Sequence, residues 1–266
     1  ADRQPEHTQI DIEMSFITED DVFGVVERLM AEIWERVARV KLSIPFPRMD
    51  YADAMSLYGS DKPDLRFGLE IRDCSDLFRG SAFGVFRSAL EGGGVVRGIA
   101  LEGGASLSRR EIADLEALAK GAGAGGLVWV KCEESGMSSP IAKFLDESQI
   151  ARLRELFSAP GPALFLLVCG LADVVGRSLA ELRLHIGRTR LVAGSTEPRF
   201  LWVNRFPLFA RAQSGGWEPA HHIFSMPLES DLSRLDADPG CVRGHLYDLV
   251  CNGTELGSGS IRIHRR

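Results

Sequence analysis

The sequence of 266 residues contains no apolar run of the roughly 20 residues that a membrane-spanning helix needs. Its start lacks the charged, apolar and small-residue regions of a secretory signal peptide. Cysteine is scarce: there are five, and no two lie in a C-x-x-C pair, which argues against a zinc knuckle or a disulfide framework. These absences predict a cytoplasmic chain with reduced thiols and no membrane partner.

Composition limits the class of partner further. With 31 basic and 37 acidic residues the formal net charge is −6, so the surface as a whole does not attract nucleic acid, although a local basic patch remains open. Apolar residues make up 45% and charged residues 26%, as in soluble globular proteins with a sizeable core. The length suffices for two domains or one large one.

The segment 247–264, YDLVCNGTELGSGSIRIH, is the most informative about function. Asn252-Gly253 between two apolar–polar runs is a strong signal for a two-residue hairpin turn. Because side chains alternate between the faces of a strand, Asp248 and Glu255 then share one face. Two carboxylates one pleat apart form a plausible site for a divalent cation.

Small residues follow these carboxylates. Strict alternation would place Arg262 on the face opposite Glu255, but one bulge within Gly257–Gly259 would rotate it onto the carboxylate face. An arginine there can bind a carboxylate or phosphate through two parallel hydrogen bonds. The alternative interpretation is an ordinary hairpin whose outer charges are solvated.

The remaining pattern predicts an α+β fold with an insertion. Residues 75–190 alternate strands and helices in a self-contained run that interrupts the outer parts, 1–74 and 191–266, as an inserted domain would. The expected strands are 10–16, 67–72, 83–88, 95–101, 127–131, 163–169 and 200–203, and the expected helices are about 20 residues after Thr18, then 51–58, 106 or 108 to 120, 146–158 and a last one ending near 186.

Three further motifs have a sufficient structural explanation. The glycines of 121–126 satisfy G-x-G-x-x-G but follow a helix and precede a strand, so they predict a helix stop and turn rather than a nucleotide loop. His221 and His222 fall in a predicted strand, where neighbouring side chains point to opposite faces, so at most one enters a given pocket. Lys62 and Arg66 lie in a polar loop and either contact phosphates or are solvated.

Taken together, the segments resemble bacterial-type aspartyl-tRNA synthetases, which are class II aminoacyl-tRNA synthetases. The strings run in the family's order from one end of the chain to the other. They are ADRQPEHTQIDIEMSF (1–16), RMDYADAMSLYGSDKPDLRFG (48–68), LSRREI (107–112), FLWVNRFPLF (200–209), HHIFSMP (221–227) and YDLVCNGTELGSGSIRIH (247–264). The resemblance implies an antiparallel class II sheet with flanking helices, interrupted by a GAD-like insertion domain at 75–190.

The resemblance also implies a reaction. L-Aspartate attacks the α-phosphate of ATP to give aspartyl-adenylate, and the aminoacyl group then passes to tRNA. Residue by residue, the family's pattern assigns Gln4 and Glu255 to ATP, Asp248 and Glu255 to Mg²⁺, Gln9 and Asp11 to the amino group of aspartate, Arg262 to its side chain, and His221, with His222 as its neighbour, to the bound aspartate. Arg262, Glu255 and Asp248 are the expected catalytic residues.

Departures from the family pattern leave two alternatives open. Arg205, Ala210 and Ser258 replace usual residues, as a catalytically silent synthetase-like paralogue would allow. A GAD-containing subunit of a tRNA-dependent amidotransferase is the other alternative, although synthetase strings flank the insertion on both sides. The chain begins without methionine and ends directly after a predicted strand. The resemblance therefore implies that motif 1 with its homodimer contact, half of motif 2, motif 3 and the anticodon-binding domain lie outside it, and that the chain alone is inactive.

Overall fold

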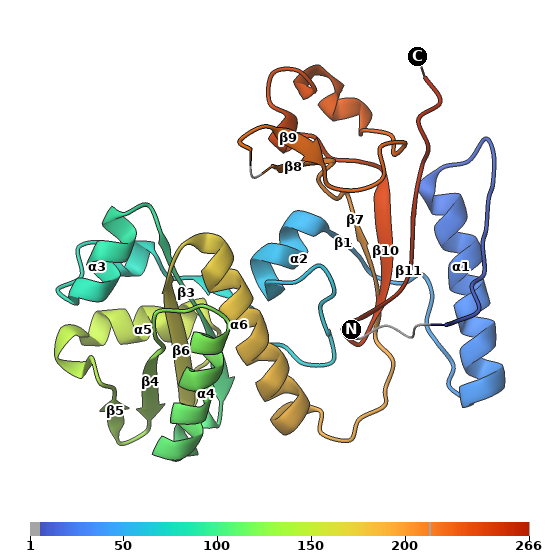
Figure 1. Ribbon diagram of the computed structural model, residues 1–266. Coiled ribbons are helices and arrows are strands. Elements are labelled where there is room, and N and C mark those ends of the chain that lie inside the picture. Colours follow the sequence, from blue (N-terminus) through green and yellow to red (C-terminus); the bar gives the residue numbers. More distant parts are fainter. Residues whose placement is uncertain (1–5, 213, 266) are drawn as a thin grey trace. The chain divides into compact units, whose positions relative to one another are not determined.

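Two compact units divide the chain in the computed structural model, which describes residues 6–212 and 214–265 (Figure 1). The first unit comprises Ala1–Pro47, Pro207–Leu246 and Gly259–Arg266, and the second comprises Arg48–Phe206 and Tyr247–Ser258. The fold is mixed α+β, with largely antiparallel sheets and flanking helices, as the sequence predicts. No helix in the described part of the chain is both long and apolar enough to cross a membrane.

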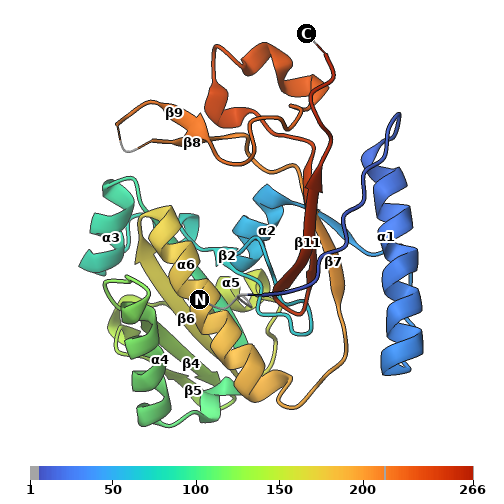
Figure 2. The same ribbon diagram turned by 45° about the vertical axis from the view of Figure 1, so that its right-hand side comes forward.

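A four-stranded sheet carries the predicted hairpin and has the order β1-β7-β10-β11 (Figure 1). Figure 2 shows β7 and β11 of this sheet from another side. Its central strands pair antiparallel, and the short edge strand pairs parallel with its neighbour. Helix α2 follows this edge strand directly and is closed by Gly59 at φ +66°, a left-handed conformation that glycine adopts without strain. The bounds are β1 Arg48–Asp50, α2 Tyr51–Tyr58, β7 Phe200–Asn204, β10 Leu246–Cys251 and β11 Thr254–Ser260.

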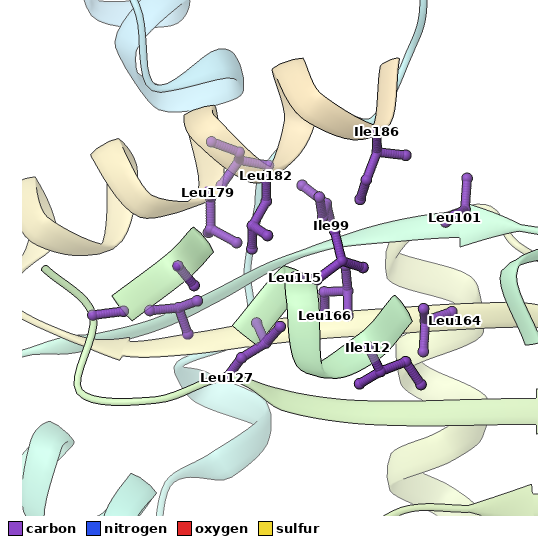
Figure 3. Packing of buried hydrophobic residues seen from close by; sticks show 14 of the residues in the cluster. Ile99, Leu101, Ile112, Leu115, Leu127, Leu164, Leu166, Leu179, Leu182 and Ile186 are labelled. Atoms are coloured by element: carbon purple, nitrogen blue, oxygen red, sulfur yellow. The ribbon is translucent and has the colours of Figure 1, made fainter. Parts of the chain in front are cut away.

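A five-stranded sheet in the order β2-β3-β6-β4-β5 is built entirely from residues 72–170. Its central strand β6 is apolar without alternation because helices cover both faces of the sheet. Figure 3 shows Leu179, Leu182 and Ile186 of α6 pointing toward Ile99 of β3 on one of these faces. The bounds are β2 Arg72–Asp73, β3 Val95–Glu102, β4 Val128–Glu133, β5 Gly136–Ser138, β6 Ala163–Gly170, α3 Gly84–Glu91, α4 Arg109–Gly121, α5 Glu147–Leu156 and α6 Ala172–Ile186.

Helix starts follow the local capping signals closely. Ser108 accepts a hydrogen bond from the Glu111 N–H at the start of α4, and Asp146 accepts one from the Gln149 N–H at the start of α5. In the first unit, Asp21 accepts hydrogen bonds from both the N–H and the hydroxyl of Thr18 at the start of α1, Glu19–Ile33. The first unit also contains the strand pair β8 Phe209–Arg211 and β9 Trp217–Pro219.

The strand predicted at Ile10–Phe16 is wrong. This segment has no regular secondary structure, and its alternate apolar side chains Ile10, Ile12 and Met14 are exposed. Alternation predicts a strand only where a sheet edge accepts the backbone hydrogen bonds, and none of the sheets among the described residues includes this segment.

Two strands predicted near the start of the insertion are also wrong. Phe83 is the N-cap of helix α3 and residues 84–88 lie within it, because Phe83, Phe86 and Leu90 recur at helical spacing and bury one face. In the segment predicted as a strand at 67–72, only Arg72 belongs to a strand, the two-residue β2. Packing of Phe67 onto α6, rather than pairing in a ladder, determines the local conformation there.

His221 and His222 do not lie on a strand. They occupy a bend before the turn at Ile223-Phe224, so the alternation argument that separated their side chains does not apply. Ser225 pairs with Arg262 through an isolated antiparallel bridge, which places the end of this turn beside the C-terminal segment of the same unit.

Candidate active site

The hairpin turn is as predicted. Asn252 and Gly253 have φ values of +52° and +82°, the pair of left-handed residues that a type I′ turn requires. The Asn252 side chain accepts a hydrogen bond from the Arg199 N–H at 2.9 Å and donates one to the Glu197 carbonyl at 3.0 Å. These bonds tie the hairpin to the chain that leads into β7.

Beyond the turn, β11 uses one residue more than β10. The turn lies directly between Cys251 and Thr254, and further along the Ile261 N–H donates to the His245 carbonyl at 2.9 Å. Thr254 and Ile261 are one residue further apart in the sequence than Cys251 and His245 are. A β-bulge adds one residue of this kind to one strand of a pair. This hydrogen bond requires one extra residue between Thr254 and Ile261, a span that includes the bulge predicted at Gly257–Gly259.

The two predicted metal carboxylates lie in the second unit. Asp248 of β10 pairs in register with Val203 and is half-buried, between the buried Tyr247 and Leu249. Glu255, the second residue of β11, forms a salt bridge with Lys62, with 2.9 Å between Oε2 and Nζ. The hydrogen bond with Glu255 raises the pKa of Lys62, and the charges of Asp61 and Asp248 add to this effect.

The segment Gly59–Phe67, which we call the anchored loop, therefore belongs to this site. Within it, Arg66 binds both carboxylate oxygens of Asp64, at 3.0 and 2.6 Å. The Asp64 side chain is fully buried, which acts to raise its pKa, but the hydrogen bonds from Arg66 outweigh burial and lower it overall. The sequence left phosphate contact and solvation open for Lys62 and Arg66. In the structure both side chains form ion pairs.

Arg183 of α6 holds the anchored loop from behind, and sequence reasoning missed it. Its guanidinium donates to the carbonyls of Asp64 and Phe67, at 2.6 and 3.1 Å. It lies between the rings of Tyr58 and Phe67, 4.5 Å from each centroid. Only 1% of the residue is exposed, and burial lowers the pKa of Arg183 to about 10. No local signal in a helical sequence distinguishes such an arginine from a solvated one.

The predicted aspartate-binding arginine lies in the first unit. Arg262 is exposed, its guanidinium lies 4.0 Å from the centroid of the Phe224 ring, and its Nη1 donates to Ser260 Oγ at 2.7 Å. The His222 ring stacks on Phe224 with centroids 4.9 Å apart and an interplanar angle of 8°. Phe224, which sequence reasoning did not select, thus orients both Arg262 and His222.

The other predicted substrate residues have simpler surroundings. Gln9 donates to Asp11 at 3.3 Å, and both side chains are exposed. His221 lies in the bend that precedes Phe224. Gln4, the predicted ATP contact, lies outside the described residues.

The carboxylate pair fits a magnesium ion in donor chemistry. Among residues 6–212 and 214–265 no group of three or more His, Cys, Asp or Glu side chains is arranged to hold a metal. Two carboxylates suffice when phosphates and water complete an octahedral oxygen shell. Glu255 already holds one cation, the Lys62 ammonium.

A second charged cluster lies within the first unit. His245 contacts Glu229 through Nε2 at 3.0 Å and Glu19 through Nδ1 at 3.2 Å. The Glu229 contact has hydrogen-bond geometry, whereas the Glu19 contact is an ion pair outside that geometry. The two carboxylates, Glu19 foremost, raise the pKa of His245.

This cluster predicts a loss of stability at alkaline pH. Because the folded-state pKa lies above the unfolded value of about 6.5, the contribution is complete below that value and disappears as pH rises through the raised pKa. Thermal unfolding of wild type and His245→Gln at pH 6 and 8.5 should show that about 1 kcal/mol of stability, present in the wild type at pH 6, is lost at pH 8.5. Equal pH dependence in the two proteins would contradict this assignment.

Known proteins match this chain along its whole length. The sequence model of the family described as tRNA synthetases class II (D, K and N) matches residues 1–266. An "Aspartate--tRNA(Asp/Asn) ligase" of Rubrobacter xylanophilus is 51% identical over 100% of this chain and 44% of its own length. A protein of the same description from Syntrophomonas wolfei is 46% identical over 100% of the chain and 46% of its own length. An "Aspartate--tRNA ligase" of Clostridium perfringens is 46% identical over 99% of the chain and 45% of its own length. The chain spans less than half the length of each of these relatives.

Proposed function

Because this chain belongs to the class II tRNA synthetases of the D, K and N group, we propose that it forms part of the catalytic core of an aspartate–tRNA ligase. The observation that carries the proposal is the match along the whole chain to curated aspartate ligases, at 46 to 51% identity in the three compared. Two of these relatives are named for tRNA(Asp/Asn), whereas the third is named for tRNA without that addition. The proposal therefore names aspartate as the amino acid and does not choose between the tRNAs.

In the proposed reaction the α-carboxylate of L-aspartate attacks the α-phosphate of ATP, giving aspartyl-adenylate and pyrophosphate. The aspartyl group then passes to the 3′-terminal adenosine of tRNA. Neither step needs a protein nucleophile, so the residues of this chain act by orienting the reactants and stabilising charge. Gln4 and Glu255 are proposed to bind ATP.

Asp248 and Glu255 would hold Mg²⁺, which when bound neutralises charge on the phosphates. Their placement on a strand pair gives them a rigid backbone, and the turn at Asn252 keeps the hairpin in place through its bonds to the preceding segment. Rigid support matters because transition-state stabilisation depends on donors and charges that are in position before the reaction.

Arg262 is proposed to bind the side-chain carboxylate of aspartate through two parallel hydrogen bonds. Its cation–π contact with Phe224 and its bond to Ser260 limit the directions in which the guanidinium points. Asparagine would leave one donor of the guanidinium without an acceptor, so it is rejected. Gln9 and Asp11 are proposed to contact the amino group, and His221, with His222 beside it, to contact the bound aspartate.

We further propose that 75–190 is a GAD-like insertion between the two parts of the core, 1–74 and 191–266. The five-stranded sheet, drawn from residues 72–170 alone, supports an inserted domain, although its first strand β2 lies just before residue 75 and the two compact units divide the chain at other places. A cytoplasmic homodimer is the proposed state of the full-length protein.

Aspartate-dependent ATP–pyrophosphate exchange by the full-length protein tests the function. We expect exchange with aspartate but not asparagine, and a loss of about a hundredfold or more in Glu255→Gln because a charge at the phosphate site is removed. The exposed Glu134→Gln, in the turn between β4 and β5, is the matched control and should retain exchange. Absence of exchange in the wild type would favour the catalytically silent paralogue.

A further inference from the structure

The anchored loop has a fixed backbone on both sides of Lys62. At its start, a Cβ on Gly59 would lie 2.4 Å from the carbonyl oxygen of Gly176 in α6, so only glycine allows this approach. At its end, Arg183 binds two of its carbonyls and Asp64 binds Arg66. The Lys62 N–H also donates to Ser60 Oγ at 3.0 Å. The reach of the Lys62 side chain is therefore set by the fold rather than by a mobile loop.

The Lys62 ammonium lies at the carboxylates that we propose for the metal. It is 2.9 Å from Glu255 Oε2, with 32% of the lysine and 23% of the glutamate side chain exposed. Asp248 and Asp61 are close enough to favour its charged form. Three acidic side chains thus lie close enough to this lysine to favour its charge.

An ammonium group and a divalent cation compete for the same carboxylate oxygens. The ammonium is a compact point charge on a flexible stem, so it can leave one oxygen and bind another nearby. A metal ion that binds without nucleotide displaces the ammonium from the carboxylate and gives it no new anionic partner. A metal ion that arrives with a nucleotide brings phosphate oxygens, which give the displaced ammonium a new partner.

We propose that Lys62 is a displaceable counter-cation for the face formed by Asp248 and Glu255, and that it moves from Glu255 to the phosphates when metal and nucleotide bind together. The inference rests on the proposed function. Its consequence is coupling: Lys62 weakens the binding of metal alone and strengthens the binding of metal in the presence of nucleotide. Lys62 is therefore a residue that determines whether the site takes up the free ion or the metal–nucleotide complex.

Binding of Mn²⁺ to the full-length protein tests this role, with free Mn²⁺ followed by electron paramagnetic resonance. Lys62→Met should bind Mn²⁺ alone about threefold to tenfold more tightly than wild type. The gain in Mn²⁺ affinity on adding α,β-methylene-ATP should shrink in the variant by a similar factor. Lys62→Arg, which keeps the charge, should retain most of the coupling. Lys120→Met, which removes an exposed lysine paired with Glu116 on α4, is the matched control and should match wild type.

Unchanged or weaker binding of Mn²⁺ alone in Lys62→Met, while Glu255→Gln lowers it, would overturn the role of Lys62 and leave the metal assignment standing. Mn²⁺ binding that Glu255→Gln does not lower would overturn both. Aspartate-dependent exchange by the wild type is measured separately, so failure of the proposed function is distinguished from failure of this inference. Circular dichroism and thermal unfolding of each variant confirm that it is folded.

Discussion

Arg262→Ala should lower kcat/KM for aspartate in ATP–pyrophosphate exchange by about a hundred- to a thousandfold. In the proposed complex, removal of the guanidinium leaves the substrate side-chain carboxylate without its partner, and such a loss costs far more than a solvent-exposed ion pair contributes. Arg262→Lys should recover only part of the activity, because an ammonium lacks the planar pair of donors. Steady-state kinetics over a range of aspartate concentrations measures both effects.

Arg265→Ala is the matched control. Arg265 is an exposed arginine in the same C-terminal segment, 3.9 Å from Glu229, and it has no proposed substrate contact. Its removal should leave kcat/KM for aspartate within about twofold of wild type. If Arg262→Ala behaves like this control, the assignment of Arg262 to the aspartate side chain is wrong. Protection by a non-hydrolysable aspartyl-adenylate analogue gives a second readout, and it should be lost in Arg262→Ala only.

The second large effect concerns stability: Arg183→Met should lower the free energy of unfolding by about 3 kcal/mol or more. The variant removes both donors to the Asp64 and Phe67 carbonyls and the cation between the Tyr58 and Phe67 rings. Each buried carbonyl left without a donor costs about 1–3 kcal/mol. Burial of the guanidinium opposes the stabilisation that these contacts give. The lowered pKa of Arg183 shows this cost, and so does its buried Nε, which has no hydrogen-bond partner among the described residues.

Urea denaturation measures the total effect, and hydrogen–deuterium exchange locates it. Protection should fall first in the anchored loop, whose carbonyls lose their donors, while the strands of the five-stranded sheet remain protected until global unfolding. Arg177→Met, on the exposed face of the same helix, should change stability by no more than about 0.5 kcal/mol. Equal effects of the two substitutions would show that the buried contacts of Arg183 contribute nothing specific.

Much of the secondary structure was predictable because its causes are local. The caps at Ser108 and Asp146, the Gly59 helix stop and the Asn252-Gly253 turn each depend on residues within a few positions of one another. Strand β6 was predictable for a different reason, since an unbroken apolar run fits a strand buried on both faces.

Two of the failures have a cause that lies outside the local sequence. Alternation at Ile10–Phe16 is compatible with a strand, but no sheet among the described residues includes this segment. At Phe83–Ser88 the sequence predicts a strand, whereas the helical spacing becomes visible only when Leu90 is included. The histidines at 221 and 222 were placed on a strand, but the chain bends there toward the bridge between Ser225 and Arg262.

The sequence by itself determined the hairpin turn, because turn type follows from adjacent residues. From the strand period it predicted that Asp248 and Glu255 share a face and that one bulge beyond them would bring Arg262 onto that face. Its strings also determined the family. Only the tertiary structure decided that Lys62 meets Glu255 and that Arg183 holds the loop which carries Lys62. These contacts join residues far apart in the chain, and the free energy of a buried or half-buried charge depends on which partners the fold places around it.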